Sequence, residues 1–219
     1  MITVETAPQG GLAEDYPTLR RRRMMGLVGG TTVAALAEIE QARSVLARTG
    51  ILRGDIRRGF GTASGVAKGL PLTVKLRLTS ANSGRAVAGR AVYLWHSDRD
   101  GAYSLYSPEL TGENYLRGVQ VSDDAGWVTF TSIFPGVAEG AWPHLHLEVY
   151  PSVAQAVSSA DRLQAFRLAL PADACARAYA DPAYAASRRN MAAEADADGW
   201  PAVTGDARRG FVATRTLTI

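Results

Sequence analysis

The sequence predicts an all-β domain, a two-sheet β-sandwich with an N-terminal helix and short peripheral helices. From residue 51 onward, short stretches of alternating apolar and polar residues recur between turn residues, as in sandwich domains. An alanine-rich stretch at 173–199 interrupts them and predicts short helices and loops outside the sheets. We therefore expect an N-terminal segment over residues 1–50 and the sandwich over residues 51–219.

The N-terminal segment has two competing interpretations. Residues 1–19 lack a clear period and are expected to be irregular, whereas residues 24–48 have the apolar spacing of a helix. Residues 20–37 join four arginines to an uncharged stretch that ends in Ala-x-Ala, as in a twin-arginine or Sec export signal. A retained helix would instead indicate a cytoplasmic protein. The uncharged stretch is too short to span a membrane, so no stable membrane insertion is expected.

The strands are expected in a regular succession after this segment. Period-two alternation or β-rich composition marks each of them, and Gly, Asp, Asn and Pro mark the turns between them. The expected strands cover residues 72–78, 91–96, 116–121, 127–133, 144–150, 166–170 and 211–219.

Charge and cysteine content exclude several classes of protein. Lys and Arg total 24 against 21 acidic residues. Four of these cations form the run at 20–23, so the rest of the chain has no net basic field and nucleic-acid binding is not expected. The single cysteine, Cys175, excludes an intrachain disulfide and is expected to be a small buried residue.

The strand at 144–150 carries two of the three histidines of the chain. His144 and His146 are two residues apart, so on a strand both imidazoles face one side, and Leu145 and Leu147 face the other. Two neutral imidazoles on a rigid strand suit iron, zinc or copper. The alternative is a pair of histidines that face solvent or have hydrogen-bonded partners.

Three longer motifs carry a resemblance to a known family: WHSDRDGAYSLYS at 95–107, YLRGVQVSDDAGWVTFTSIFPG at 115–136 and WPHLHLEVY at 142–150. In these, the chain resembles the intradiol ring-cleavage dioxygenases, most closely the extracellular-type branch related to protocatechuate and catechol dioxygenases. The resemblance implies a β-sandwich that holds non-haem Fe(III) between two tyrosinates and two histidines. It also implies a small aromatic substrate, a catechol that is cleaved between its hydroxyls. Family members often form dimers through N-terminal helices, so the resemblance allows a homodimer through residues 33–48; the alternative is that the apolar face of this helix packs on its own domain.

The resemblance carries over to three ligands. Tyr103 matches the retained tyrosinate, and His144 and His146 match the two histidines. His96 matches a residue beside the site; a hydrogen-bonded structural role competes with a role as third histidine ligand. Glu139 is a candidate replacement ligand or general base, against the alternative of a solvated loop charge.

Two positions depart from the family pattern. Ala138 stands where the second tyrosinate is expected, and Ala141 stands where an arginine is expected to stabilise negative charge on the substrate. With His96 and Trp142, they would line a substrate pocket with room for a bulkier apolar ligand. One fewer anionic ligand favours Fe(II) or Zn(II) relative to Fe(III), so the expected cofactor is Fe(III) or Fe(II) non-haem iron.

Two functions from different classes follow. The first is a variant iron-dependent intradiol dioxygenase that acts on a catechol-like aromatic. The second is a repurposed relative without ring cleavage. It would be a metal-independent enzyme for cyclisation or rearrangement of an aromatic or polyketide-like metabolite, or a binding protein that uses the same pocket.

Overall fold

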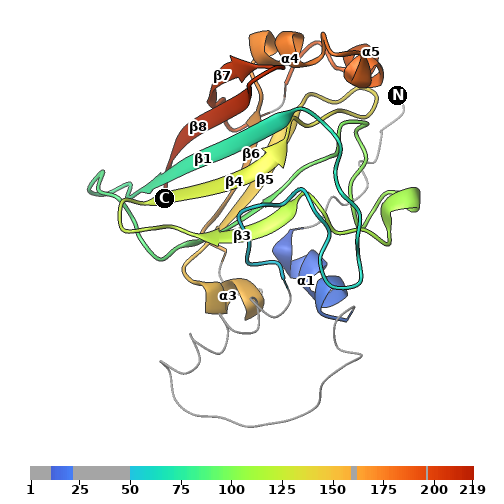
Figure 1. Cartoon of the computed structure of the whole chain (residues 1–219). Coiled ribbons are helices and arrows are strands. Elements are labelled where there is room, and N and C mark those ends of the chain that lie inside the picture. The colour runs from blue at the N-terminus through green and yellow to red at the C-terminus, as the bar shows by residue number, and fades with distance from the viewer. Residues whose placement is uncertain (1–10, 22–49, 159–161, 196) are drawn as a thin grey trace, which may run out of the picture.

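Two four-stranded sheets dominate the part of the chain that the structure, a computed structural model, describes: residues 11–21, 50–158, 162–195 and 197–219 (Figure 1). The first sheet has the order β4-β1-β8-β7 and the second the order β3-β2-β5-β6. Strands β1 and β8 run parallel, and the other neighbours are antiparallel. The strands are β1 (Pro71–Thr79), β2 (Ala91–Trp95), β3 (Arg117–Val121), β4 (Trp127–Ile133), β5 (His144–Tyr150), β6 (Gln164–Ala169), β7 (Ala202–Asp206) and β8 (Gly210–Thr218). The helices are α1 (Leu12–Arg21), η2 (Pro108–Leu110), α3 (Val153–Ser158), α4 (Ala172–Ala178), η3 (Pro182–Tyr184) and α5 (Ala185–Asn190).

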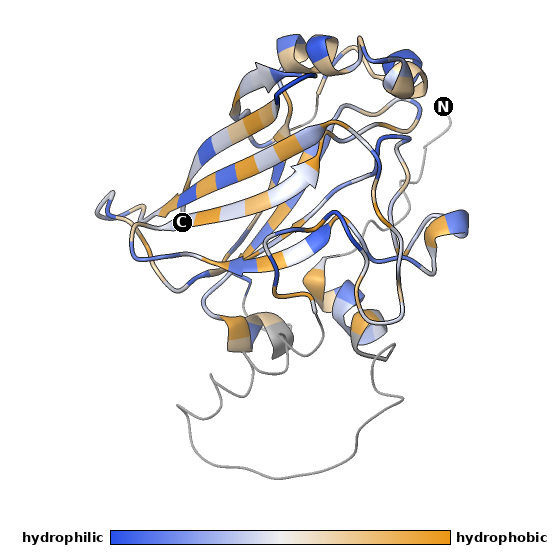
Figure 2. Cartoon of the chain, in the orientation of Figure 1, coloured by the Kyte–Doolittle hydropathy of each residue, from blue (hydrophilic) through white to orange (hydrophobic). Residues whose placement is uncertain are grey.

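The main core lies between the two sheets, as the predicted all-β sandwich requires. Alternate residues of each strand point inward, so hydrophobic and hydrophilic bands alternate along the ribbons (Figure 2). Leu72 and Val74 of β1 meet Leu145 and Leu147 of β5 in one buried cluster. Burial of these side chains against each other is what holds the sheets together.

A second apolar cluster covers the outer face of the second sheet. Tyr93 and Trp95 of β2 and Tyr150 of β5 point away from the main core. They are buried against Leu12 and Tyr16 of α1 and against residues of α3, which lie along this side of the molecule (Figure 1). The histidine strand is therefore buried on both faces, and its histidines lie outside the sandwich core.

Helix α1 corrects the expectation that residues 1–19 are irregular. Its first N–H, from Leu12, donates to Glu148 Oε2 at 2.8 Å, and this carboxylate caps the helix from 136 residues away. Asp15 in its first turn is buried against the second sheet. Partners so far away in the chain cannot be recognised from the local sequence. Pro17, which lies inside the helix, is a residue that normally argues against a helix. The helix predicted over 24–48 lies outside the described residues, as do residues 22–37 of the export-signal interpretation.

The remaining elements match the predictions except for β7 and for the short helices η2 and α3, which lie outside the stretch where helices were expected. Short helices α4, η3 and α5 fill the alanine-rich stretch, as expected. Strand β7 was not predicted, because its side chains are largely exposed and show no apolar alternation. In the part of the chain that the structure describes, no helix has the length and apolar character to cross a membrane.

Candidate functional site

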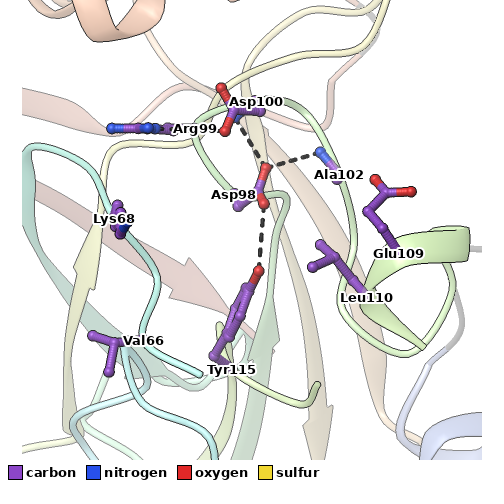
Figure 3. A pocket seen from close by; sticks show the side chains of 9 residues that line it. All are labelled: Val66, Lys68, Asp98, Arg99, Asp100, Ala102, Glu109, Leu110 and Tyr115. Atoms are coloured by element: carbon purple, nitrogen blue, oxygen red, sulfur yellow. Dashed lines mark hydrogen bonds and ion pairs between the residues drawn. The ribbon is translucent and has the colours of Figure 1, made fainter. Parts of the chain in front are cut away.

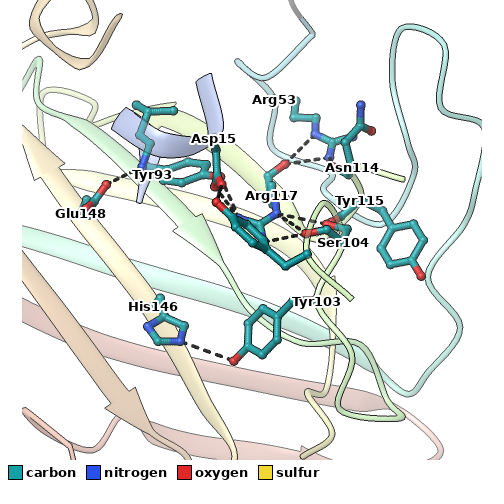
Figure 4. Close-up of polar contacts among 12 residues, drawn as sticks. Asp15, Arg53, Tyr93, Tyr103, Ser104, Asn114, Tyr115, Arg117, His146 and Glu148 are labelled. Carbon is teal, nitrogen blue, oxygen red and sulfur yellow. Dashed lines mark hydrogen bonds and ion pairs between the residues drawn. The ribbon is translucent and has the colours of Figure 1, made fainter. Parts of the chain in front are cut away.

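Three side chains from two separate segments meet on the outer face of the second sheet. Tyr103 Oη lies 3.4 Å from His144 Nε2 and 3.4 Å from His146 Nε2. The two Nε2 atoms are 2.8 Å apart. The structure thus brings together the phenol and the two imidazoles that the sequence indicated; Figure 4 shows Tyr103 and His146 of this set. We call these three side chains the Tyr-His-His triangle.

Strand β5 sets the direction of both histidines. Leu145 and Leu147 are buried in the main core between the sheets. The residues between them point to the opposite face, which carries Trp95 and the second apolar cluster. The two imidazoles therefore share one face, as the alternation predicted.

His144 is oriented by the residue two positions before it. Its Nδ1 lies 2.6 Å from the carbonyl oxygen of Trp142, which can only accept, so Nδ1 carries the proton of the neutral ring. This leaves the lone pair on Nε2, the atom in the Tyr-His-His triangle. Trp142 is itself fixed, because its Nε1 donates to the carbonyl of Leu170 at 2.8 Å.

His146 is held by a stacked ring and is neutral. Its imidazole is nearly parallel to the indole of Trp95, with an interplanar angle of 9° and ring centroids 4.9 Å apart. Burial, together with the charges of His144 and Arg167, lowers the pKa of His146 to about 2. The ring therefore offers a neutral nitrogen at any working pH, as metal binding requires.

Tyr103 is positioned by a tight loop. Its N–H donates to Ser107 Oγ at 2.9 Å, and the Asp98 carboxylate accepts the N–H of Ala102 at 3.0 Å. Gly101 has φ of +89°, a conformation that favours glycine, and a Cβ there would lie 2.3 Å from the carbonyl carbon of Val137. Burial raises the pKa of Tyr103 to about 12, so the phenol keeps its proton unless a cation displaces it.

The donor set of the Tyr-His-His triangle fits a transition metal. Such an ion binds imidazole nitrogen and carboxylate oxygen at about 2.0–2.2 Å. The sides of the triangle are 3.4, 3.4 and 2.8 Å, so a single point can lie at about this bond length from all three atoms, and one ion can contact all three donors. Within the described residues, no group of three or more His, Cys, Asp or Glu side chains is placed to hold a metal. Among the described residues, the phenol of Tyr103 is the donor that lies close to both imidazoles.

His96 lies apart from the triangle with both ring nitrogens engaged. Nδ1 is 2.7 Å from the carbonyl oxygen of Ser97, and Nε2 is 2.6 Å from Ser132 Oγ. The side chain is buried, and this burial lowers its pKa to about 4. These contacts are those of a hydrogen-bonded structural histidine.

The loop before β5 carries the positions that depart from the family pattern. Ala138 and Glu139 are exposed and Ala141 is half-buried. The loop is fastened to the segment at α5: Gly140 N–H donates to the Asn190 carbonyl, and Ala192 N–H donates to the Ala141 carbonyl. None of the hydrogen bonds and ion pairs described for this structure joins the Glu139 side chain to the Tyr-His-His triangle. A catalytic role for Glu139 therefore stays a prediction.

A buried ionic cluster beside the triangle was missed at the sequence level. Arg117 of β3 is fully buried and forms an ion pair with Asp15 of α1. Tyr93 donates to the same carboxylate at 2.5 Å, and Arg117 also donates to the Ser104 carbonyl at 2.8 Å (Figure 4). Because Ser104 follows Tyr103, this cluster anchors the tyrosine loop to the sheet. The one sequence feature that could have indicated this cluster was Arg117, a single arginine at the start of a strand with mostly apolar residues.

A hollow of about 360 Å³ lies on the other side of the tyrosine loop (Figure 3). Burial raises the pKa of Asp98 in its wall, and the Asp98 carboxylate lies 3.5 Å from the Tyr115 hydroxyl. Lys68, Arg99 and Glu109 give this hollow mixed charge. It shares Ala102 with the tyrosine loop, but no atom of the Tyr-His-His triangle lines it.

Comparisons with known proteins show similarity to dioxygenases. The family model for Dioxygenase matches residues 54–155, the segment that contains Tyr103, His144 and His146. An intradiol ring-cleavage dioxygenase from Tetranychus urticae has a similar fold, with a TM-score of 0.62 and 22% identity over 77% of this chain and 86% of that chain. Chlorocatechol 1,2-dioxygenase from Pseudomonas putida also aligns, with a TM-score of 0.50 and 17% identity over 77% of this chain and 65% of that one.

Sequence similarity points the same way over a shorter stretch. Chlorocatechol 1,2-dioxygenase from Rhodococcus opacus is 38% identical over 64 residues, which is 28% of this chain and 25% of that protein. The fold is a β-sandwich like that of the intradiol dioxygenases. The resemblance to the intradiol ring-cleavage dioxygenases that was inferred from the motifs is confirmed by the match to the Dioxygenase family model and by the shared fold.

Proposed function

We propose that this chain binds a catechol-like aromatic substrate at a non-haem iron ion held by Tyr103, His144 and His146. The observation that carries this proposal is the triangle of donor atoms, 2.8–3.4 Å on a side. Its place within the dioxygenase-matched segment supports the same chemistry. The catechol-like substrate and the bound iron are both parts of what we propose.

Each residue of the triangle has a defined task. When bound, the iron supplies a Lewis acid and a redox centre for the reaction of an aromatic diol with dioxygen. Tyr103 releases its phenolic proton as the metal binds, so metal affinity rises with pH. His144 presents Nε2 because Nδ1 donates to the Trp142 carbonyl, and the stack on Trp95 holds the plane of His146.

The two alanines shape the substrate side. Ala138 supplies no phenol as a ligand, and Ala141 supplies no guanidinium. With only three protein ligands, the metal would keep open coordination positions for both oxygens of the diol. Both positions are at least partly exposed, which admits water and a larger ring system than a single catechol. Without a positive side chain at position 141, any reaction step that builds negative charge on the substrate is expected to be slower.

Iron content and colour test the proposal. Protein expressed with added iron should contain the metal and show the visible charge-transfer band of a tyrosinate bound to Fe(III). Tyr103→Phe should lose this band, whereas Tyr115→Phe, a neighbouring tyrosine whose hydroxyl faces Asp98, should retain it. Colourless wild-type protein without metal by elemental analysis would refute the iron site.

The alanines at 138 and 141 favour one second candidate, a repurposed relative that binds or rearranges an aromatic or polyketide-like metabolite without a metal. Such ligands should raise the melting temperature equally with and without a chelator. A stabilisation that disappears on chelation would assign ligand binding to the metal and exclude this candidate.

A further inference from the structure

Trp95 is the large side chain beside the Tyr-His-His triangle that has no assigned role. Strand register places it directly opposite His146, on the same face of the second sheet. Its indole stacks on the His146 imidazole at 4.9 Å and on the Tyr93 ring at 5.1 Å. These two stacks hold the indole in one orientation next to a predicted ligand.

Among the residues that the structure describes, none accepts a hydrogen bond from the indole N–H of Trp95. The residue is 6% exposed, and Nε1 is buried without a hydrogen-bond acceptor. A buried tryptophan N–H usually finds an acceptor, and an unmatched one calls for an explanation. Trp142, at the same site, shows the ordinary arrangement, because its Nε1 donates to the Leu170 carbonyl at 2.8 Å.

The polar groups around Trp95 are engaged with one another. The Asp15 carboxylate accepts from Tyr93, Tyr106 and Arg117. The carbonyl of Ser104 accepts from Arg117 twice, through Nε at 3.2 Å and Nη2 at 2.8 Å. These two acceptors are thus already engaged by other donors. Within the described part of the chain, a bound molecule with an oxygen atom can supply the acceptor that Trp95 lacks.

We propose that Trp95 is a ligand-binding residue, whose indole N–H donates to an oxygen atom of the aromatic ligand bound beside His146. The inference rests on the ligand class of the proposed function and does not require the metal. An indole N–H can only donate, so it selects a ligand with a phenolic, phenolate or carbonyl oxygen at that position. A site with a buried donor rejects analogues that lack the matching acceptor.

Nuclear magnetic resonance of the indole N–H groups tests the contact directly. The chain has four tryptophans, and Trp95→Phe identifies the Trp95 signal by removing it. Catechol added to iron-free and to zinc-loaded protein should move the Trp95 signal downfield, as a new hydrogen bond requires. The Trp142 signal should move less, because that N–H already has its acceptor. A Trp95 signal that does not move when catechol is saturating overturns the inference.

Affinity gives a second measurement. Trp95→Phe keeps an aromatic ring for the stack and removes the N–H, so catechol should bind about tenfold more weakly. Toluene, which has no oxygen, should bind wild type and variant alike. The control Trp127→Phe, on β4 of the other sheet, should leave catechol binding unchanged. Equal catechol affinity in wild type and Trp95→Phe overturns the inference.

The outcomes separate this inference from the proposed function. Catechol that binds and moves the Trp95 signal without any metal requirement supports the inference and shows that catechol binding does not depend on the iron. Catechol that binds only with metal and leaves the Trp95 signal in place supports the iron site and refutes the inference. Wild-type protein that binds no catechol under either condition refutes both.

Discussion

At the scale of single residues, the position of Tyr103 depends on a glycine two residues earlier. Gly101 has φ of +89°, and its Cα faces the backbone of Val137 too closely for a side chain. The tyrosine loop and the loop before β5 can therefore approach each other only with glycine at this position. One residue thus couples the third donor of the triangle to the segment that carries Ala138.

Gly101→Ala should destabilise the protein and weaken metal binding together. Positive φ and the backbone clash should lower the free energy of unfolding by about 1–3 kcal/mol, because the loop must move to relieve them. Gly84→Ala is the matched control: its φ is +67° and nothing lies within 4 Å of the added Cβ. It should cost roughly 1 kcal/mol and leave zinc affinity intact, as measured by urea unfolding and zinc titration. Equal zinc affinity in both variants would show that Gly101 does not position Tyr103.

Protonation of His96 should lower the free energy of unfolding in mild acid. Burial holds the folded pKa at about 4, below the ordinary 6.5, so the unfolded chain takes up the proton first. The stability that this provides is present above pH 6.5 and is lost as the pH falls from 6.5 to 4, by about 3 kcal/mol. Urea unfolding between pH 7 and pH 4 measures it. The difference between wild type and His96→Gln should shrink over this window; a constant difference would contradict the prediction.

The meeting of three side chains could be predicted from sequence, whereas their supports could not. Strand parity places His144 and His146 on one face, and the family resemblance adds Tyr103; their role as metal ligands stays a prediction. The stack of Trp95 on His146 and the contacts of His96 with Ser97 and Ser132 arise only once strands lie side by side. Strand register, which no local pattern specifies, creates them.

At the scale of elements, helix α1 is attached to the second sheet through buried charge. Glu148 accepts the Leu12 N–H at 2.8 Å and pairs with Arg162 at 2.5 Å. Asp15 pairs with Arg117 out of contact with water. A charge buried in this way is stable only while its partner is present. The helix and the tyrosine loop, which Arg117 also holds, are therefore expected to loosen together.

Asp15→Ala should be strongly destabilising because it leaves Arg117 buried and unpaired. The expected loss of unfolding free energy is about 3–5 kcal/mol. The double variant Asp15→Ala with Arg117→Met should recover much of it, since no uncompensated charge remains. Chemical denaturation of both variants measures the coupling, and additive losses in the double variant would argue against it.

The same element shows where sequence patterns are insufficient. Strands β1 to β6 and β8 were predicted within a few residues, because the alternation that buries one face is written in the local sequence. Helix α1 was missed because its cap, Glu148, is 136 residues away and its ion-pair partner 102 residues away. Strand β7 was missed because its exposed side chains carry no apolar period.

At the scale of the whole molecule, metal binding and folding stability are linked. An ion that binds only the assembled triangle stabilises the native state by about 2.7 kcal/mol when its concentration is a hundred times its dissociation constant. Zinc should therefore raise the melting temperature of wild type and of His96→Gln, and a chelator should reverse the shift. His146→Ala should show no zinc-dependent shift. An equal shift in that variant would place the bound zinc elsewhere.

The pairing of β1 with β8 has a consequence for the order of events during synthesis. These strands are parallel neighbours at the centre of the first sheet, although Leu72 and its partner Phe211 are separated by most of the domain. Residues 71–79 leave the ribosome long before residues 210–218 exist, so β1 has only β4 beside it until then. Contacts of such long sequence separation are associated with slow folding. We therefore expect the site-bearing second sheet, complete once β6 has emerged, to assemble first and the β8 edge of β1 to wait for a chaperone or for the end of translation.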